Sequence, residues 1–407
     1  MTTVLISGAS VAGPVLAYWL KRYGFEPTVV ERAPALRHSL GGHAIDLFGP
    51  AMDVIERMGL LTDVYAARTR TQFMTMYRPG RRPVKADLDR VVAGISSRHV
   101  EIMRGELTKL LYDASADDVE YVFGDSIASL HDDGHGVDVT FEQGEPRRFD
   151  LVIGADGLHS NVRRLVFGPE ESYLKYLGGY LAVYTVPNYL GLDGRMLMHP
   201  AIDKLVGTYA VHQTGQARAL FLWRRPEQFS YDYRDIDQQK DLLRQEFGRD
   251  GWEVPNFIKH LDAAEDFYFD SISQITLDSW HRGRVALVGD AGYSPGPAVG
   301  GGTSLAAVTA YVLAGELATY ADPVAGLRAY EDRVRGFVLQ NRQVAPKMMK
   351  ALLPSSPAGV WATVHALNLI ARVPLGLQKL VSRQGLGFAK ALDAITITDY
   401  KAGYKVS

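Results

Sequence analysis

The chain has 407 residues, of which 47% are hydrophobic and 22% charged, a composition typical of a globular protein large enough for two domains. A formal net charge of −2 gives no electrostatic reason to expect nucleic acid or an anionic membrane surface as a partner. The sequence contains no cysteine, which excludes disulfides, thiolate metal sites and cysteine nucleophiles, and we expect no bound metal.

The first thirty residues predict a strand, a glycine turn, a helix and a second strand that ends in an acid. Gly8 permits the sharp turn, Gly13 lets helix and strand approach closely, and the helix N-terminus attracts a pyrophosphate. Glu31 is placed to accept hydrogen bonds from an adenosine ribose. We therefore expect a dinucleotide site here, formed by Gly8, Ser10, Val11, Ala12, Gly13, Glu31 and Arg32.

The ends of the chain bear on where the protein is found. The chain opens on a structural strand without a basic flank, which is not the pattern of a signal peptide. The apolar run at residues 358–371 is too short to span a bilayer. We expect a cytoplasmic protein with no membrane span, present as a monomer or a dimer.

A glycine-containing loop follows the second strand and leads into a short predicted strand. Arg37, His43 and Asp46 are candidate site residues because they lie close to the end of the nucleotide strand, and His43 and Asp46 are the candidate catalytic residues among them. The alternative interpretation is that each is an ordinary solvated loop residue.

Two later stretches belong with the first. Arg104 sits where a short predicted strand gives way to a helix, from which a guanidinium could reach a phosphate or a ribityl chain. Residues 150–157 form a buried parallel strand that ends in Asp156 and Gly157, at a sheet edge where ligands bind. Residues 119–141 alternate and predict a small antiparallel unit between them.

Residues 172–280 predict a second domain. Four aromatic and β-branched runs separated by turns indicate an antiparallel sheet, and a polar helix follows near residues 237–248. Tyr209, His212 and Trp223 are candidate catalytic residues that would line a substrate pocket over the cofactor. Alternation alone does not say which face each side chain takes, and an inward aromatic is more often core.

The chain then returns to the first domain. An apolar strand ends in Gly289 and Asp290, and a glycine-rich loop opens a long helix at Thr303. A helix N-terminus reached through successive glycines is a second place where a dipole faces an anion. A long ligand that touches both helix N-termini is the economical explanation, with a second group of candidates in Gly289, Asp290, Pro297, Gly300, Gly301, Gly302 and Thr303.

These elements define a domain plan. We expect an α/β protein with a Rossmann-like domain at residues 1–171 and 281–345, and an inserted antiparallel substrate domain at residues 172–280. Residues 346–407 would form C-terminal helices that pack on both domains, with the last of them near residues 375–392.

Three stretches together, residues 8–13 with Glu31, residues 154–157, and residues 289–291 with the glycine loop, resemble the single-component FAD-dependent aromatic hydroxylases. This para-hydroxybenzoate hydroxylase-like family includes the tetracycline-inactivating and other natural-product monooxygenases. The resemblance implies a Rossmann-like fold that binds FAD, with NADPH or NADH as reductant and dioxygen as co-substrate. It further implies hydroxylation of an aromatic or polyketide-like small molecule through a flavin C4a-hydroperoxide, with Pro297 at the catalytic centre.

The resemblance also implies roles for single residues. Gly8, Ser10, Gly13 and Glu31 would hold the ADP half of FAD, and Arg104 would contact the flavin chain. Asp290 would bind the ribityl hydroxyls, the helix after Gly302 would point at the flavin pyrimidine edge, and Asp156-Gly157 would serve both FAD and the nicotinamide nucleotide. Arg37, Gly42 and Asp46 match a loop that borders the isoalloxazine.

The chain departs from the family pattern at Gly292, Tyr293, Ser304 and Thr309, where Ala, His, Asn and Asp are usual. Three alternatives stay open at this point. One is a flavin-dependent reductase or dehydrogenase on the same fold, which needs no protected hydroperoxide. The others are a two-domain NAD dehydrogenase without flavin and a flavin-binding protein without turnover.

Overall fold

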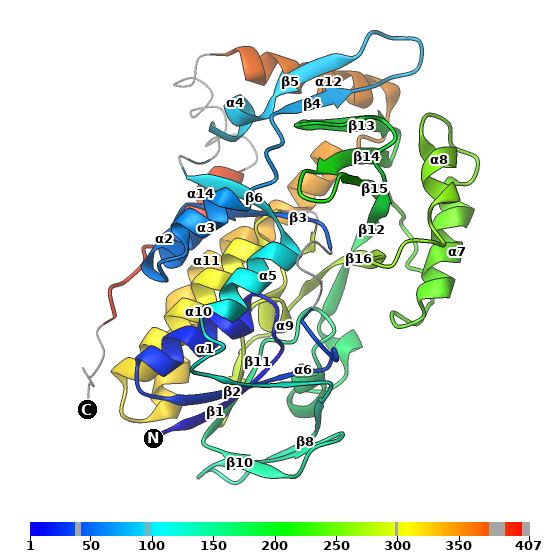
Figure 1. The fold of residues 1–407 in the computed structure, drawn as a ribbon. Coiled ribbons are helices and arrows are strands. Elements are labelled where there is room, and N and C mark those ends of the chain that lie inside the picture. The colour runs from blue at the N-terminus through cyan, green and yellow to red at the C-terminus, as the bar shows by residue number, and fades with distance from the viewer. Residues whose placement is uncertain (37–41, 94–95, 97, 298–299, 374–386, 401–407) are drawn as a thin grey trace.

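A computed structural model of the chain describes residues 1–36, 42–93, 96, 98–297, 300–373 and 387–400. Two sheets dominate it: a six-stranded sheet that is mainly parallel and a seven-stranded sheet that is mainly antiparallel (Figure 1). Helices pack against both. The predicted α/β class, with a Rossmann-like domain, an inserted antiparallel sheet and C-terminal helices, is confirmed.

The six-stranded sheet forms from the predicted βαβ opening and from strands that return to it later in the chain. Apolar runs of strand length are buried on both faces, as is typical of parallel strands. Only the two strands at one edge, residues 281–282 and 285–287, pair antiparallel. In spatial order the strands are β17 (His281–Arg282), β18 (Val285–Leu287), β11 (Leu151–Gly154), β1 (Thr3–Ser7), β2 (Glu26–Glu31) and β7 (Glu120–Phe123).

Helices cover this sheet, and its core lies between them. α1 (Ala12–Arg22) packs on β1 and β2, and α10 (Gly302–Thr319) packs on α1. α10 is apolar all round and almost wholly buried, because α11 (Pro323–Leu352) covers its other side (Figure 1). The remaining helices of this region are α2 (Gly49–Arg57), α3 (Leu61–Ala66), α5 (Arg104–Asp113), α6 (Asn161–Val166) and α9 (Asp290–Tyr293).

The seven-stranded sheet carries the aromatic runs. All its neighbouring strands are antiparallel except β13 and β4. In spatial order the strands are β16 (Tyr268–Ile275), β12 (Leu174–Pro187), β15 (Gln216–Arg224), β14 (Lys204–Val211), β13 (Arg195–Ala201), β4 (Phe73–Met76) and β5 (Val84–Asp87).

The sheet extends beyond the residues predicted for it, 172–280. β4 and β5 form a hairpin from the first part of the chain, and β4 pairs in parallel with β13, so the antiparallel sheet takes its last two strands from the predicted FAD-binding segment. The pairing is long-range, and no local pattern in either strand reveals it.

The two faces of this sheet have different neighbours. One face packs under α7 (Ile236–Phe247) and α8 (Val254–Lys259), with Trp223 in its core. The other face packs against the end of α11 and against α12 (Pro357–Arg372), through side chains such as Met349. The face toward α11 is the one that also meets the six-stranded domain (Figure 1).

Smaller elements complete the fold. β3 (Ala44–Phe48) pairs with β6 (His99–Met103), and β8 (Ile127–Asp132), β9 (Val137–Phe141) and β10 (Arg147–Phe149) form a three-stranded antiparallel sheet. The first run predicted for that unit instead forms β7 of the parallel sheet. Of the helix expected near residues 375–392, α14 (Phe388–Leu392) is described and the rest lies outside the described residues. The remaining elements are α4 (Leu88–Ala93) and the short 3-10 turn η1 (Glu170–Ser172).

Candidate active site

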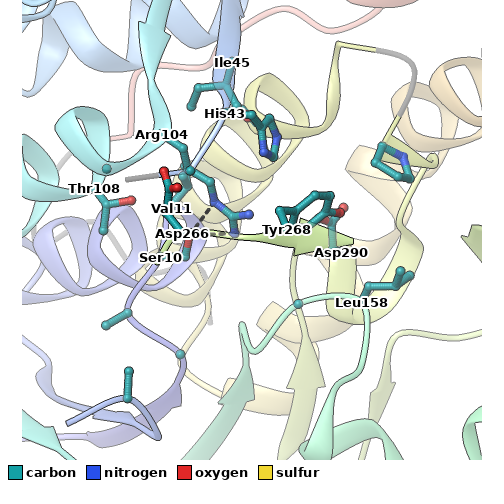
Figure 2. Close-up of a pocket in the computed structure, with 18 of the residues that line it drawn as sticks. Ser10, Val11, His43, Ile45, Arg104, Thr108, Leu158, Asp266, Tyr268 and Asp290 are labelled. Carbon is teal, nitrogen blue, oxygen red and sulfur yellow. Dashed lines mark hydrogen bonds between the residues drawn. The ribbon is translucent and has the colours of Figure 1, made fainter. Parts of the chain in front are cut away.

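A cavity of about 1160 Å³ lies where the carboxyl end of the parallel sheet faces the seven-stranded sheet. Its walls come from segments far apart in the sequence, as Figure 2 shows. Among the predicted site residues, those that line it are Gly8, Ser10, Val11, Ala12, Glu31, Arg32, Gly42, His43, Asp46, Arg104, Asp156, Gly157, Asp290, Pro297, Gly300, Gly302 and Thr303.

The other predicted residues lie elsewhere. Gly13, Gly289 and Gly301 do not line the cavity, although their neighbours do. Arg37 lies outside the described residues. Tyr209, His212 and Trp223 also lie outside the cavity lining.

The glycine turn brings the N-terminus of α1 to the cavity. Gly8 has φ +109°, and a Cβ there would stand 2.6 Å from the carbonyl oxygen of Ala155 on the neighbouring strand connection. A Cβ on Gly13 would stand 1.9 Å from the carbonyl oxygen of Gly8. Only glycine fits at either position, so the close helix–strand approach expected from the sequence is present.

Glu31 ends β2 at the cavity wall and stabilises the turn. Its carboxylate accepts the backbone N–H of Ala9 at 2.9 Å and that of Ala33 at 2.9 Å. A carboxylate has about four lone-pair sites, so hydroxyl donors in the cavity can still be accepted. The geometry suits an acid that fixes a glycine turn and also binds a diol.

Arg104 fills the space beside the turn. Its Nε and Nη2 donate to Ser10 Oγ at 3.3 and 3.0 Å, and its backbone N–H donates to the carbonyl of His43 at 3.1 Å (Figure 2). Ser10, which stands where the fingerprint has its middle glycine, therefore positions this guanidinium. Burial raises the pKa of Asp290 across the cavity, and the charge of Arg104 opposes that rise.

Asp156 is turned toward α6 rather than into the cavity centre. Its carboxylate accepts the hydroxyl of Ser160 and the backbone N–H of Val162 at 3.0 Å, and Ser160 caps the helix by accepting from Arg163. Burial raises the pKa of Asp156, and the hydrogen bond from Ser160 opposes that rise. Asp156 thus shapes the cavity edge by anchoring a helix N-terminus.

His159 is a cavity residue that sequence reasoning missed. Its Nδ1 lies 2.8 Å from Glu170, its Nε2 forms a longer 3.4 Å ion pair with Asp270, and its ring stacks on Tyr233 with centroids 4.1 Å apart. Burial disfavours the charged ring, but the two carboxylates outweigh it and raise the pKa of His159 to about 10. The ion pair with Asp270 ties the loop after β11 to β16 of the seven-stranded sheet.

The seven-stranded sheet contributes a polar wall that was also missed. Arg218 is 1% exposed, its Nη2 lies 3.2 Å from Asp266, and its Nε donates to the carbonyl of Gly42 at 3.0 Å. The ring of Tyr268 lies 5.1 Å from that of His43. An arginine inside an otherwise apolar strand was the available sequence signal.

The aromatic candidates have structural roles. Trp223 is fully buried on the face that packs under α7, with its ring 5.3 Å from Phe247. Tyr209 lies on the site face, and its hydroxyl accepts the backbone N–H of Ala44 at 2.9 Å. His212 begins the turn after β14, and its Nε2 lies 3.2 Å from Nη1 of Arg70.

The departures from the family pattern are accommodated locally. The hydroxyl of Tyr293 bonds that of Tyr330 at 2.5 Å in the core, and Thr309 donates to the carbonyl of Leu305 one turn back. Ser304 accepts the backbone N–H of Phe48 at 3.0 Å and so ties α10 to β3. None of Gly292, Tyr293, Ser304 and Thr309 belongs to the cavity lining.

No helix among the described residues combines the length and apolarity that a membrane crossing requires. In the same part of the chain, no group of three or more His, Cys, Asp or Glu side chains is arranged to hold a metal ion.

The parallel sheet, the glycine turn and the cavity between two helix N-termini define a dinucleotide-binding flavoprotein fold. Residues 1–344 match the family model described as "FAD binding domain", so the chain belongs to this family and is an FAD-dependent monooxygenase. The predicted membership of the para-hydroxybenzoate hydroxylase-like group is confirmed.

Several relatives extend this likeness. An uncharacterized protein of Mycobacterium tuberculosis (strain ATCC 25618 / H37Rv) is 44% identical over 91% of this chain and 99% of its own. A flavin-dependent monooxygenase of an unknown prokaryotic organism is 38% identical over 98% of both chains. The crystal structure of tetracycline destructase Tet(55) superposes with a TM-score of 0.84 at 37% identity, covering 98% of each chain.

Proposed function

We propose that the protein is a cytoplasmic enzyme that uses NAD(P)H and dioxygen to hydroxylate an aromatic or polycyclic small molecule. The observation that supports this proposal is one continuous cavity that joins Glu31 and the N-termini of α1 and α10 to the polar wall of the second sheet. A cavity of about 1160 Å³ exceeds the usual 300 to 1,000 Å³ of a small-molecule site, so a dinucleotide and a substrate can share it.

The residues present fit FAD. Gly8 leaves room for a phosphate beside the turn, Glu31 suits the adenosine ribose, and Arg104 and Asp290 suit the phosphates and the ribityl hydroxyls in turn. The N-terminus of α10 would face the flavin pyrimidine edge. When bound, FAD supplies the hydride acceptor and the centre that reacts with dioxygen.

The second sheet would hold the substrate and exclude water. Arg218, Asp266 and Tyr268 offer a charged pair beside an aromatic ring, which suits a ring system that carries oxygen substituents. Relatives named flavin-dependent monooxygenase and tetracycline destructase support a polycyclic substrate class. The fixed Arg218 and His43 would orient that substrate while the wall keeps solvent from the reacting atoms.

The test is a screen of phenolic and polycyclic compounds against the FAD-loaded protein. NAD(P)H oxidation, dioxygen consumption and hydrogen peroxide release are measured together, and the product is analysed by mass. The proposal expects at least one compound to stimulate oxidation with one oxygen atom added and little peroxide. Substrate-stimulated NAD(P)H oxidation without dioxygen consumption would contradict it and favour a reductase.

Cofactor identity has a separate test. Heat release followed by chromatography should give FAD, because Glu31 lines the cavity and suits the ribose of an adenosine half, which FMN lacks. FMN in the supernatant would contradict the assignment.

A further inference from the structure

The short ladder of β3 and β6 places two carboxylates opposite each other behind the cavity. Asp46 pairs directly with Glu101 in the register, and the neighbouring His99 donates or accepts at Asp46 Oδ1 through its Nε2 at 2.7 Å. Like charges directly opposite in a ladder are destabilising. Two carboxylates facing each other at this position are therefore not explained by stabilisation of the ladder.

The surroundings of Glu101 favour its protonated form. Burial and the facing charge of Asp46 raise the pKa of Glu101, against the opposing effects of Thr69, His99 and Thr71. The hydroxyls of Thr69 and Thr71 both bond Glu101 Oε1, the second at 3.2 Å. Two carboxylates and one imidazole thus lie within a single cluster.

Asp46 is the member of the cluster that reaches the cavity. It lines the cavity wall, whereas His99 and Glu101 do not. Its carboxylate packs on the glycine loop, where a Cβ on Gly300 would stand 3.2 Å from Asp46 Oδ2. Ser304 fixes the backbone by donating to the carbonyl of Asp46 at 3.3 Å and accepting from Phe48.

His99 is the partly exposed partner of this carboxylate. Its side chain is 18% exposed, and its ring lies 5.0 Å from that of Phe48. An imidazole that bonds a carboxylate and remains partly exposed can exchange protons with water. The cluster therefore joins a carboxylate that lines the cavity to a partly exposed imidazole outside the lining.

We propose that Asp46 delivers a proton into the cavity, with His99 as the positioning residue that returns a proton to it and Glu101 as the positioning residue that controls their shared charge. This inference rests on the proposed function. Hydroxylation oxidises one NAD(P)H, inserts one oxygen atom of dioxygen, reduces the other to water and consumes one proton. The proton would pass from solvent to His99, then to Asp46 Oδ1, and from that carboxyl to the oxygen being reduced.

Among the residues that the structure describes, few other ionisable groups face the cluster. β3 contributes Asp46, β6 contributes His99 and Glu101, and β14 contributes Tyr209, whose pKa burial raises above its ordinary value. α10 contributes the neutral hydroxyl of Ser304, and the loop before β4 contributes Thr69 and Thr71 together with Arg68 and Arg70. Arg70 contacts His212 rather than the acids.

The kinetic test uses the FAD-loaded protein, reduced anaerobically with dithionite and mixed with dioxygen across the neutral pH range. His99→Gln keeps a hydrogen-bond donor but cannot carry the proton, so we expect the pH profile to flatten and the rate to fall roughly tenfold, with FAD occupancy unchanged. His131→Gln, on the exposed side of β8, is the control. A wild-type pH profile in His99→Gln would overturn the relay.

A second measurement does not depend on turnover. A carboxyl whose pKa is raised on folding makes the protein less stable as the pH rises above the unfolded pKa of about 4.3. A glutamine does not titrate, so the Tm of Glu101→Gln should increase relative to that of wild type as the pH rises. Glu145→Gln, in the exposed turn before β10, controls for the lost charge. The same pH dependence in both variants would overturn the role of Glu101.

The two readouts separate this inference from the proposed function. Protein that binds FAD but does not consume dioxygen in the screen refutes the proposed function, and the relay with it. An active enzyme whose Glu101→Gln and His99→Gln variants behave as wild type refutes the relay alone. If His99→Gln loses FAD, Glu101→Gln, which is nearly isosteric, decides the question.

Discussion

Individual side chains around the cavity are held by more than one partner, and this fixes their chemistry. Arg104 illustrates it: two of its nitrogens bond Ser10, and its backbone bonds the carbonyl of His43. A guanidinium pre-ordered in this way loses little conformational entropy when an anion arrives. Asp290 stands across the same space, so this part of the cavity faces a ligand with a guanidinium on one side and a carboxyl group on the other.

Asp290→Asn should weaken FAD binding while leaving the fold intact. A hydrogen bond to a charged group contributes about 1.5 to 3 kcal/mol, which corresponds to a rise in Kd of roughly tenfold to a hundredfold. FAD affinity can be measured by titration of the apoprotein, with Asp237→Asn on α7 as the control. Unchanged affinity in Asp290→Asn would show that the carboxylate does not contact the cofactor.

His159 should make the stability of the protein depend on pH. Its pKa is raised to about 10 in the folded state and is about 6.5 in the unfolded state. The stabilisation from Glu170 and Asp270 is therefore fully present below about pH 6.5 and lost as pH rises toward about 10. The Tm difference between wild type and His159→Gln should shrink over that interval.

His135→Gln, on the exposed turn after β8, is the control for that measurement. A Tm difference between wild type and His159→Gln that stays constant over the same interval would mean that the ion pairs do not form in solution.

At the scale of elements, the glycine turn of the first βαβ unit is the tightest junction at the cavity. Gly13→Ala would place a methyl group 1.9 Å from the carbonyl oxygen of Gly8, so α1 must move away from β1. Overpacking of this kind costs roughly 1 to 3 kcal/mol, and we expect a lower Tm together with loss of FAD.

Gly336→Ala is a matched control for that substitution. Gly336 lies within α11 with open space around its Cβ position, so alanine there should stabilise the helix by roughly 0.5 to 1 kcal/mol. Denaturant unfolding should show that Gly13→Ala lowers the free energy of unfolding and that Gly336→Ala raises it. A neutral Gly13→Ala would contradict the close approach.

Local patterns predicted some elements well and others poorly. The strand, glycine turn, helix and acid around Gly8 and Glu31 follow one another in sequence, so their geometry was predictable. Which face of β15 each side chain takes was not predictable. Trp223 and Arg218 lie on opposite faces of this strand, and both faces are buried. Both faces of a covered strand are apolar, which removes the usual signal. The charge of Arg218 is the exception.

At the scale of the whole molecule, we expect the two faces of the seven-stranded sheet to differ in role. The face under α7 should contribute stability, and the face toward the cavity should set the substrate response. Trp223→Ala should cost about 3 to 5 kcal/mol of unfolding free energy, because a buried ring leaves the core under α7, and should leave the substrate response of the folded fraction unchanged. Arg218→Lys keeps a charge but cannot reach both Asp266 and Gly42, so it should retain stability and release more peroxide.

Tm, FAD content and peroxide yield measured together distinguish the two variants. Arg195→Lys, at the exposed first residue of β13, is the control for Arg218→Lys. The division between faces would be wrong if Trp223→Ala changed the coupling of the folded enzyme, or if Arg218→Lys matched wild type in every readout.

The parallel pairing of β4 with β13 affects how the chain can fold during synthesis. Arg195 pairs with Phe73, so the β4–β5 hairpin leaves the ribosome long before its partner strand exists. Until then its apolar edge has no neighbour in the chain and is open to chaperones or to another nascent copy. A fragment limited to residues 172–280 would expose the opposite edge, on β13, so neither part of the sheet is a self-sufficient folding unit.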